Sequence, residues 1–241
     1  MEPQEYHLMV AVEDGMWWYR ALHTRVLEAL GPPRGRVLDA GCGTGGFLAR
    51  LKAAWPEVEA TGLEYDPGAA ARARAKSGVL VADGSVLTMP FADASFQAVT
   101  SMDVLCHAAV EPATALAEMR RVLAPGGRLM LNLPAFQWLL STHDHRVHNV
   151  RRFTASEAAR MLTDAGFSAV TARYWNGLLL PLMVLQRKVM ASTPEGRSDV
   201  TAFPPWQDRL LFSLTEVERQ LARLRLSVPA GSSVLAIATR P

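Results

Sequence analysis

The sequence has few cysteines, few lysines and no excess of charge of either sign. Two cysteines among 241 residues, Cys42 and Cys106, make no disulfide framework, so we expect a reducing, cytoplasmic setting. The formal net charge is only +2, from 25 basic and 23 acidic residues, which argues against nucleic acid as the substrate. Lysine occurs only at positions 52, 76 and 188, an arginine bias more typical of genome composition than of function.

The sequence also lacks a long apolar run. The longest one, Gly177 to Leu185, is too short to span a bilayer, although it could touch a membrane surface or an apolar substrate. The first fifteen residues show no basic region followed by an apolar run, so we predict no signal peptide. With 49% hydrophobic and 20% charged residues, the chain is expected to fold as an ordinary soluble globule.

Strand and helix patterns alternate along the chain. This alternation predicts an α/β fold with a Rossmann-like, seven-stranded, mainly parallel sheet and helices on both faces. Strands are predicted at 36–40, 58–63, 79–82, 96–101, 128–133, 167–175 and 233–239, with a turn at 125–127. Helices are predicted at 7–30, 45–54, 67–76, 111–123, 154–164, 178–190 and 206–226. Thr154 and Glu157 have the spacing of a capping box.

A glycine-rich turn follows the first predicted strand, in the segment VLDAGCGTG from Val37 to Gly45. Glycines allow a ligand to approach the main chain closely, and open parallel sheets bind ligands beyond the carboxyl ends of their strands. The turn alone also fits a nicotinamide-binding fold, because Gly41, Gly43 and Gly46 approximate the pattern G-x-G-x-x-G.

Acidic residues follow the next two predicted strands. Glu64, in GLEYDP, can accept hydrogen bonds from both hydroxyls of a ribose. Asp83, in VADGS, can accept from an adenine amine, with the backbone of Gly84 and Ser85 completing that edge. The fourth strand then leads into SMDVLCH, and RRVLAPGG precedes the fifth.

In this order the motifs between about Arg34 and Trp175 strongly resemble those of the class I S-adenosylmethionine-dependent methyltransferases, and they fit a nicotinamide-binding fold less well. The resemblance implies that the glycine turn holds the methionine part of S-adenosylmethionine, that Glu64 binds the ribose and Asp83 the adenine, and that S-adenosylhomocysteine is the product. The predicted cofactor-binding residues are Asp39, Gly41, Cys42, Gly43, Gly45, Glu64, Tyr65, Asp83, Gly84, Ser85, Met102, Trp18 and Arg20.

Two segments supply candidates for the acceptor side. One is Asp103 to His107, after the fourth strand, and the other is Ser141 to Phe153, after the fifth. Methyl transfer from a sulfonium needs the nucleophile at about 3–3.5 Å and in line, and a protonated nucleophile also needs a base such as histidine. The catalytic candidates are His148, His143, His107 and Arg152; the acceptor-binding candidates are Tyr19, Asp103, His145, Arg151, Trp175 and Asn176. A hydrogen-bonded structural loop is the alternative for 141–153.

The aromatic segment WWYR, before the first strand, suggests a lid. Trp18 could face the sulfonium cation and Arg20 could pair with the cofactor's carboxylate, or the aromatic residues could simply anchor the helix to the core. His143, His145 and His148 with Asp144 have the chemistry of zinc or iron ligands, but no second cluster completes a site, so we expect no metal.

We predict one domain over residues 1–241: a helical lid (1–33), a cofactor-binding core (34–175), a helical insertion that caps the substrate (176–232) and the last strand (233–241). WWYR, the histidine segment and YWNGLLLPL resemble a bacterial methyltransferase-11-like subgroup whose acceptors are poorly defined. The expected function is methylation of an oxygen or nitrogen of a small molecule, such as a secondary metabolite. The alternatives are a sugar or lipid-linked acceptor, and a cofactor-binding module without catalysis; a homodimer through the insertion is compatible with the sequence.

Overall fold

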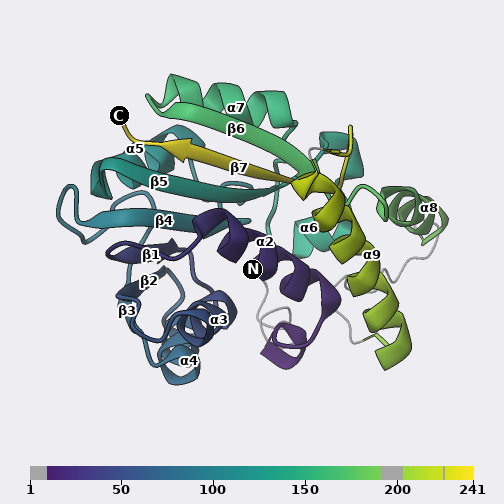
Figure 1. Cartoon of the computed structure of the whole chain (residues 1–241), viewed down its shortest axis with the longest axis horizontal. Helices are drawn as coiled ribbons and strands as arrows, with labels where there is room; N and C mark the ends of the chain where they lie inside the picture. Colours follow the sequence, from purple (N-terminus) through teal and green to yellow (C-terminus); the bar gives the residue numbers. More distant parts are fainter. Residues whose placement is uncertain (1–9, 191–202, 225) are drawn as a thin grey trace.

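The computed structural model describes residues 10–190, 203–224 and 226–241, and only the backbone of 186–190. A seven-stranded sheet has the order β3-β2-β1-β4-β5-β7-β6 (Figure 1). Strand β7 runs antiparallel to both of its neighbours, and the other six strands are parallel to one another. The strands are β1 (Val37–Ala40), β2 (Ala60–Glu64), β3 (Leu80–Asp83), β4 (Phe96–Met102), β5 (Leu123–Pro134), β6 (Ser168–Trp175) and β7 (Ser233–Thr239). The predicted fold class is confirmed.

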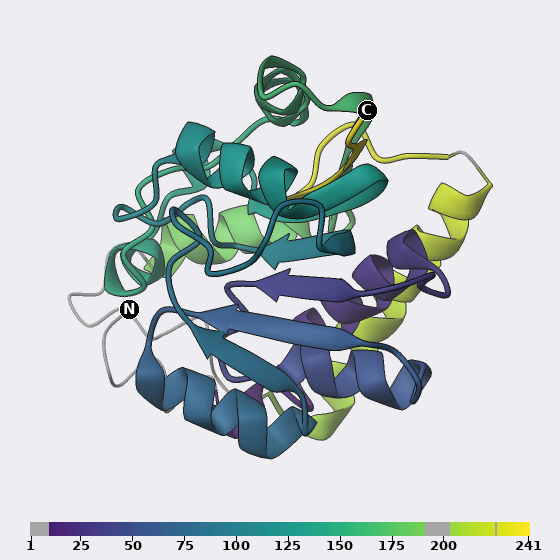
Figure 2. The same cartoon turned by 90° about the vertical axis from the view of Figure 1, so that its left-hand side faces the viewer.

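Helices cover both faces of this sheet because its central strands are apolar on both sides. Leu22 of α2 and Phe47 of α3 pack in one apolar layer, and Leu116 of α5 and Leu162 of α7 pack in the other. Figure 2 shows α4 and α5 on opposite sides of the strands. The helices are α2 (Trp17–Leu30), α3 (Gly46–Ala54), α4 (Pro67–Ser77), α5 (Pro112–Val122), α6 (Thr142–Arg146), α7 (Ala155–Asp164), α8 (Leu180–Met190) and α9 (Pro205–Arg223), with a short 3₁₀ turn at Gln137–Leu139.

The predicted N-terminal helix over 7–30 is in fact interrupted. Residues 10–12 are helical, 13–15 form a turn, and α2 begins at Trp17; residues 7–9 lie outside the described residues. The main-chain N–H of Trp17 donates to Oδ1 of Asp208 at 2.6 Å, so a carboxylate from α9 satisfies a free N–H at the start of α2. Sequence periodicity could not show this break, because the capping group lies 191 residues away.

Two other elements differ from the prediction. The segment 141–153 contains the short helix α6, which the sequence analysis missed although Ser141 and Asp144 form a capping box. Strand β5 begins at Leu123, so the predicted turn at 125–127 is an irregular part of the strand, with Gly126 at φ 75° and a register shift opposite Phe96 and Ala98. The capping box of Thr154 and Glu157 at the start of α7 is confirmed.

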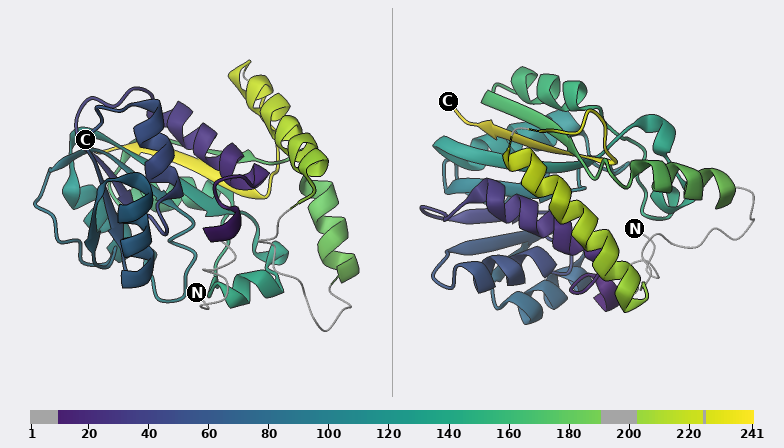
Figure 3. Two further views of the ribbon diagram at one scale, coloured as in Figure 1. Left: turned by 90° about the horizontal axis from the view of Figure 1, so that it is seen from below. Right: turned by 45° about the vertical axis from the view of Figure 1, so that its right-hand side comes forward.

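The insertion contributes α8 and α9, as predicted. Helix α9 packs against α2 and lies on the outer side of it (Figures 1 and 3). Most of the linker predicted between these two helices, 192–205, lies outside the described residues. None of the helices in the described part of the chain is long and apolar enough to cross a membrane.

Candidate functional site

The glycine turn lies between the carboxyl end of β1 and the start of α3. Gly41, Gly43 and Gly45 have φ values of 83°, 54° and 87°, in the left-handed region that favours glycine. A Cβ atom on Gly41 would overlap a methyl group of Val104, and one on Gly45 would lie 2.7 Å from the Cα of Ala73. The turn therefore needs glycine both for its conformation and for its packing.

Glu64, the last residue of β2, lies directly beside this turn. Its Oε2 accepts from the N–H of Gly43 at 2.8 Å, and its Oε1 accepts from the N–H of Asp66 at 3.0 Å. Burial raises the pKa of the Glu64 carboxyl, and the hydrogen bonds from Asp66 and Gly43 oppose that rise. A carboxylate has about four acceptor positions, so Glu64 can hold the turn and still accept from two hydroxyls.

Asp39, on β1, is fully buried next to Glu64. One carboxylate oxygen accepts from the Thr100 hydroxyl at 2.9 Å, while Oδ2 has no hydrogen-bond partner within the described part of the chain. Burial is the main reason that the pKa of Asp39 rises to about 7, and the negative charge of Glu64 adds to it. A buried carboxylate oxygen without a partner is costly, and a cation bound at the turn would satisfy it.

Asp83, at the end of β3, is more exposed than expected for a buried binding group. Its Oδ1 accepts from Arg74 at 2.8 Å, and Arg74 also donates to the Val81 carbonyl. The N–H of Gly84 donates to the Glu64 carbonyl at 2.9 Å, so the ends of β2 and β3 are joined beside Asp83. The surroundings of three other predicted cofactor residues give no indication of a ligand. Tyr65 is 80% exposed and Cys42 is buried, and the Ser85 hydroxyl accepts from the N–H of Leu87.

Asp103 follows β4 and has a positive φ of 53°, which is strained for a residue other than glycine. Its Oδ1 accepts from Asn132 at 2.9 Å, and the Oδ1 of Asn132 accepts from the indole N–H of Trp175, also at 2.9 Å. Burial is the largest cause of the rise in the pKa of Asp103 to about 7. Three elements, β4, β5 and β6, therefore fix the position of this one carboxyl. Met102, directly before it, packs against the apolar layer that holds α2 and α3.

The two segments predicted for the acceptor side do come together. The N–H of Ala108 donates to the His148 carbonyl at 2.9 Å, and His107 forms an isolated bridge with Asn149. His143 lies on α6 and is partly buried, whereas His145 and His148 are exposed, with His148 at a φ of 60°. Burial lowers the pKa of His107. The segments that carry His107 and His148 thus meet at one loop junction, shortly after Asp103 in the chain.

The arginines of this junction hold the loop and do not face open space. Arg151 donates to the carbonyls of His107 and Val110, at 2.7 and 2.9 Å. Arg152 is 6% exposed, contacts both oxygens of Asp144 at 2.8 Å and also donates to the Ala135 carbonyl. The structure thus gives both arginines partners that hold the loop, because a buried charge needs a partner, and their role in orienting an acceptor stays a prediction.

The lid residues also have other partners than predicted. Arg20 pairs with Asp208 at 3.0 Å and lies over the ring of Phe212, while its pairing with the cofactor's carboxylate stays a prediction. Trp18 stacks on the buried Trp175 at 6.2 Å and contacts Tyr19 edge to face. These ring contacts anchor α2 to the core, and a role of the segment as a lid stays a prediction.

Asn176, which the sequence analysis predicted to contact an acceptor, is fully buried. Its side chain donates to the Ser232 hydroxyl at 2.8 Å, and its main-chain N–H donates to Glu218 at 2.6 Å. Glu218 also accepts from the N–H groups of Gly177 and Leu178. The buried carboxylate of Glu218 therefore fastens α9 to the end of β6.

Sequence reasoning missed Glu13, Asn132, Asp208 and Glu218. Glu13 is buried over the glycine turn, where it accepts from the Thr44 hydroxyl at 2.6 Å and pairs with Lys76 of α4. The sequence Glu13-Asp14-Gly15 was a local sign of the helix break that precedes α2. Nothing local marks the other three, because their partners are distant in the sequence. Over residues 10–190, 203–224 and 226–241, no group of three or more His, Cys, Asp or Glu side chains is arranged to hold a metal ion.

Comparisons with known proteins agree with this arrangement. A family model described as a methyltransferase domain matches residues 38–131. A demethylmenaquinone methyltransferase of Deinococcus radiodurans is 40% identical over 129 residues, which are 52% of this chain and 51% of that protein. A ubiquinone/menaquinone biosynthesis C-methyltransferase of Methylobacterium nodulans is 30% identical over 196 residues, which are 66% of this chain and 77% of that protein.

A solved structure from Thermotoga maritima, described as an S-adenosylmethionine-dependent methyltransferase and possible histamine N-methyltransferase, has the same fold. Its TM-score is 0.63 at 21% identity, over 99% of this chain and 95% of that one. The chain spans about half the length of the first curated relative, 51%. The acidic residues near the ends of β1, β2 and β3, the sheet topology and these matches all indicate the same family. The chain belongs to the class I S-adenosylmethionine-dependent methyltransferases.

Proposed function

We propose that the chain binds S-adenosylmethionine at the carboxyl ends of β1, β2 and β3 and methylates an oxygen or nitrogen atom of a small molecule. The observation that carries the proposal is the buried Oδ2 of Asp39, which has no partner within the described residues and lies on β1 next to the glycine turn. A bound amino-acid ammonium would supply the missing partner, so the residues present fit this cofactor.

Each residue around the turn then has a role. Asp39 pairs with the ammonium group, Glu64 accepts from the ribose hydroxyls while it holds the N–H of Gly43, and Asp83 faces the adenine with Gly84. Glu13, over Thr44, closes the turn from the N-terminal side, as a lid would. The bound cofactor supplies an electrophilic methyl group on a sulfonium.

The proton of the acceptor needs a base in this proposal. His143 and His148 are the candidates from the histidine segment, with His107 across the loop junction. Asp103 is a further candidate, because it follows β4 and its raised pKa of about 7 matches a base that works near neutral pH. The described helices of the insertion, α8 and α9, would cap the acceptor.

Methylation of a quinone carbon is a second candidate. The relatives in Deinococcus radiodurans and Methylobacterium nodulans, which are quinone-pathway methyltransferases, favour it. A sugar or lipid-linked acceptor and a module that binds the cofactor without catalysis remain alternatives. Incubation with methyl-labelled cofactor and four acceptor panels separates these candidates: phenols, amines, a short-chain demethylmenaquinone, and sugars with lipid-linked sugars. Tight cofactor binding with no labelled product on any panel would support the non-catalytic module.

Cofactor binding itself is tested by titration calorimetry with S-adenosylhomocysteine. Glu64→Gln should weaken binding about 10- to 100-fold, because charged hydrogen-bond acceptors contribute roughly 1.5–3 kcal/mol. Glu59→Gln is the matched control: Glu59 is exposed and precedes the other end of the same strand. Equal affinity in the two variants would contradict the proposed site.

The base is tested with whichever acceptor the panels give. Single alanine variants of His107, His143 and His148 and Asp103→Asn should keep their affinity for S-adenosylhomocysteine, and the variant that lacks the base should lose about 100-fold or more in kcat. Unchanged kcat in all four variants would leave positioning alone as the source of catalysis.

A further inference from the structure

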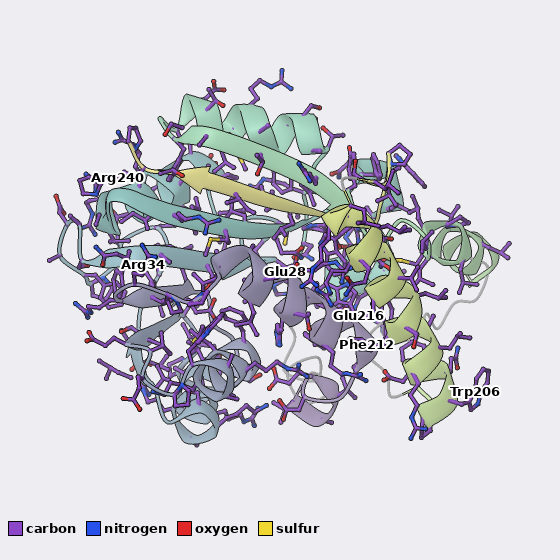
Figure 4. The ribbon with its side chains drawn as sticks, in the orientation of Figure 1. Glu28, Arg34, Trp206, Phe212, Glu216 and Arg240 are labelled. Carbon is purple, nitrogen blue, oxygen red and sulfur yellow. The ribbon has the colours of Figure 1, made fainter. Side chains whose placement is uncertain are left out.

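Helix α9 carries apolar side chains on two opposite faces. On the inner face, Leu211 and Thr215 are buried, and Leu211 packs with Trp17 of α2. On the outer face, four large side chains form an exposed stripe: Trp206, Leu210, Val217 and Leu224 are 68%, 51%, 53% and 71% exposed. Figure 4 shows Trp206 projecting away from the rest of the molecule. A helix that is apolar on two sides normally has a neighbour on each side.

The spacing of the stripe is that of a coiled coil. With Ser213 and Gln220, its members stand at 206, 210, 213, 217, 220 and 224, so the steps alternate between four and three residues. This gives an average repeat of about 3.5 residues, the period at which one helix keeps contact with another. At about 100° per residue the four apolar members fall within about 40° of one another. Such a narrow stripe fits a second helix better than a lipid surface.

A groove on the same face has the shape that such a contact needs. It holds about 400 Å³ and is lined by Phe212, Ser213, Glu216, Val217, Gln220, Leu221 and Leu224. Residues 213, 216, 217 and 220 form one set at i, i+3, i+4 and i+7, and residues 217, 220, 221 and 224 form the next. A coiled-coil partner inserts one side chain into each such set of four.

We propose that this stripe binds the α9 stripe of a second copy of the chain, with the two helices parallel. In that arrangement each layer meets its own copy, so Gln220 faces Gln220 and Ser213 faces Ser213, and the polar side chains can pair with each other. An antiparallel arrangement would place the Gln220 amide against Leu210, which leaves the amide without a partner.

The flanking charges also favour the parallel arrangement. Arg209, Glu216 and Arg223 stand on one edge of the stripe, and Leu214 and Leu221 on the other. Parallel helices bring the charged edge of one copy beside the apolar edge of the other, where the side-chain stems can pack. Antiparallel helices would place Glu216 against Glu216 and Arg209 against Arg223, which are like charges.

The available area suits a reversible dimer. From Trp206 to Leu224 the stripe is about 27 Å long at 1.5 Å per residue. Two copies would bury on the order of 1,200 Å² in total, at the lower limit for specific stable interfaces. We therefore expect a dimer that dissociates on dilution.

Sedimentation equilibrium of the full chain between about 1 and 200 µM tests this proposal. The expected mass rises with concentration from 26.3 kDa toward twice that value. Leu210→Glu should keep the mass at 26.3 kDa, whereas Leu182→Glu on α8, where Leu182 is 53% exposed, should dimerise like the wild type. A monomer at every concentration, or dimers in both variants, would overturn the proposal.

The orientation is tested by oxidative cross-linking. Ser213→Cys should form a covalent dimer, because parallel helices bring residue 213 against its own copy; the native Cys42 and Cys106 are buried. Ser156→Cys, on exposed α7, controls for random collisions and should stay monomeric in denaturing gels. A dimer that Leu210→Glu abolishes but Ser213→Cys does not cross-link overturns the parallel arrangement. Binding to phosphatidylglycerol vesicles by a monomer, lost in Leu210→Glu, would show a lipid surface as the occupant instead.

Discussion

The Nδ2 of Asn132 lies 2.9 Å from Oδ1 of Asp103, and the N–H of Asp103 donates to the carbonyl of Asn132 at the same distance. Two hydrogen bonds between the same two residues hold the strained turn after β4 against β5. Because the other side of the Asn132 amide accepts from Trp175, the amide orientation is fixed, and with it the atom that faces Asp103.

The indole N–H of Trp175 should therefore contribute to stability separately from its ring. Trp175→Phe keeps an aromatic ring against Trp18 but leaves the buried Oδ1 of Asn132 without its donor. We expect the free energy of unfolding to fall by about 1–3 kcal/mol. Trp138→Phe, at a tryptophan that is 62% exposed, should change it by less than about 0.5 kcal/mol. Urea titrations of both variants check this expectation.

Cofactor affinity should depend on pH through Asp39. The pKa of its carboxyl is raised to about 7, so at pH 6 most molecules carry the neutral acid, which binds a cation poorly. Affinity for S-adenosylhomocysteine should rise about tenfold from pH 6 to pH 8, as the carboxyl ionises. Calorimetry at several pH values should show this slope in the wild type and in Asp103→Asn, and a flat profile in Asp39→Asn. A slope that survives in Asp39→Asn would assign the proton to another group.

The buried pair of Asp144 and Arg152 should be among the costliest contacts to break. Asp144→Asn leaves a guanidinium at 6% exposure without its counter-charge, so we expect a loss of about 3–5 kcal/mol in unfolding free energy. Asp164→Asn, on the exposed face of α7, is the matched control and should be neutral within about 0.5 kcal/mol. A small effect of Asp144→Asn would mean that Arg152 is free to serve another ligand.

The same pair predicts a loss of stability in acid. Burial by itself would raise the pKa of Asp144, but Arg152 and the hydrogen bonds from Ser141 outweigh it and hold the pKa below its ordinary value. A carboxyl with a lowered pKa stabilises the fold above its unfolded pKa of about 4, and that contribution is lost as the pH falls below it. Thermal unfolding between pH 2 and 5 should show a steeper decline in the wild type than in Asp144→Asn.

Alanine substitutions at Gly41 and Gly78 can distinguish the cost of backbone strain from the cost of steric overlap. Both have positive φ, 83° and 65°, but a Cβ atom on Gly41 would meet Val104, whereas one on Gly78 would meet nothing within 4 Å. Gly78→Ala should cost about 1 kcal/mol, the price of the left-handed conformation alone. Gly41→Ala should cost at least about 1 kcal/mol more, because the neighbour must move. Equal losses in urea titrations would mean that the Val104 side chain moves away without cost.

From the sequence alone one could predict the alternating strands and helices, the glycine turn, Asp39 and Glu64 near the carboxyl ends of their strands, and the capping box at Thr154. All of these are local patterns, because a period of two or 3.6 residues and a cap three residues away are set by the neighbouring backbone. The spacing of the apolar residues on α9 is also visible in the sequence. Whether they form an exposed stripe depends on which face of the helix packs against α2.

The partners of the charged and polar side chains could be seen only in the folded chain. Arg20 pairs with Asp208, which is 188 residues away, and Trp175 donates to Asn132, which is 43 residues away in the sequence. Arg152 pairs with Asp144, a partner that the sequence analysis did not predict. A buried charge or amide takes whatever partner the fold brings within about 3 Å, and that distance leaves no periodic trace in the sequence. The residues free to bind a ligand could therefore be separated from those that hold the fold only after the partners were known.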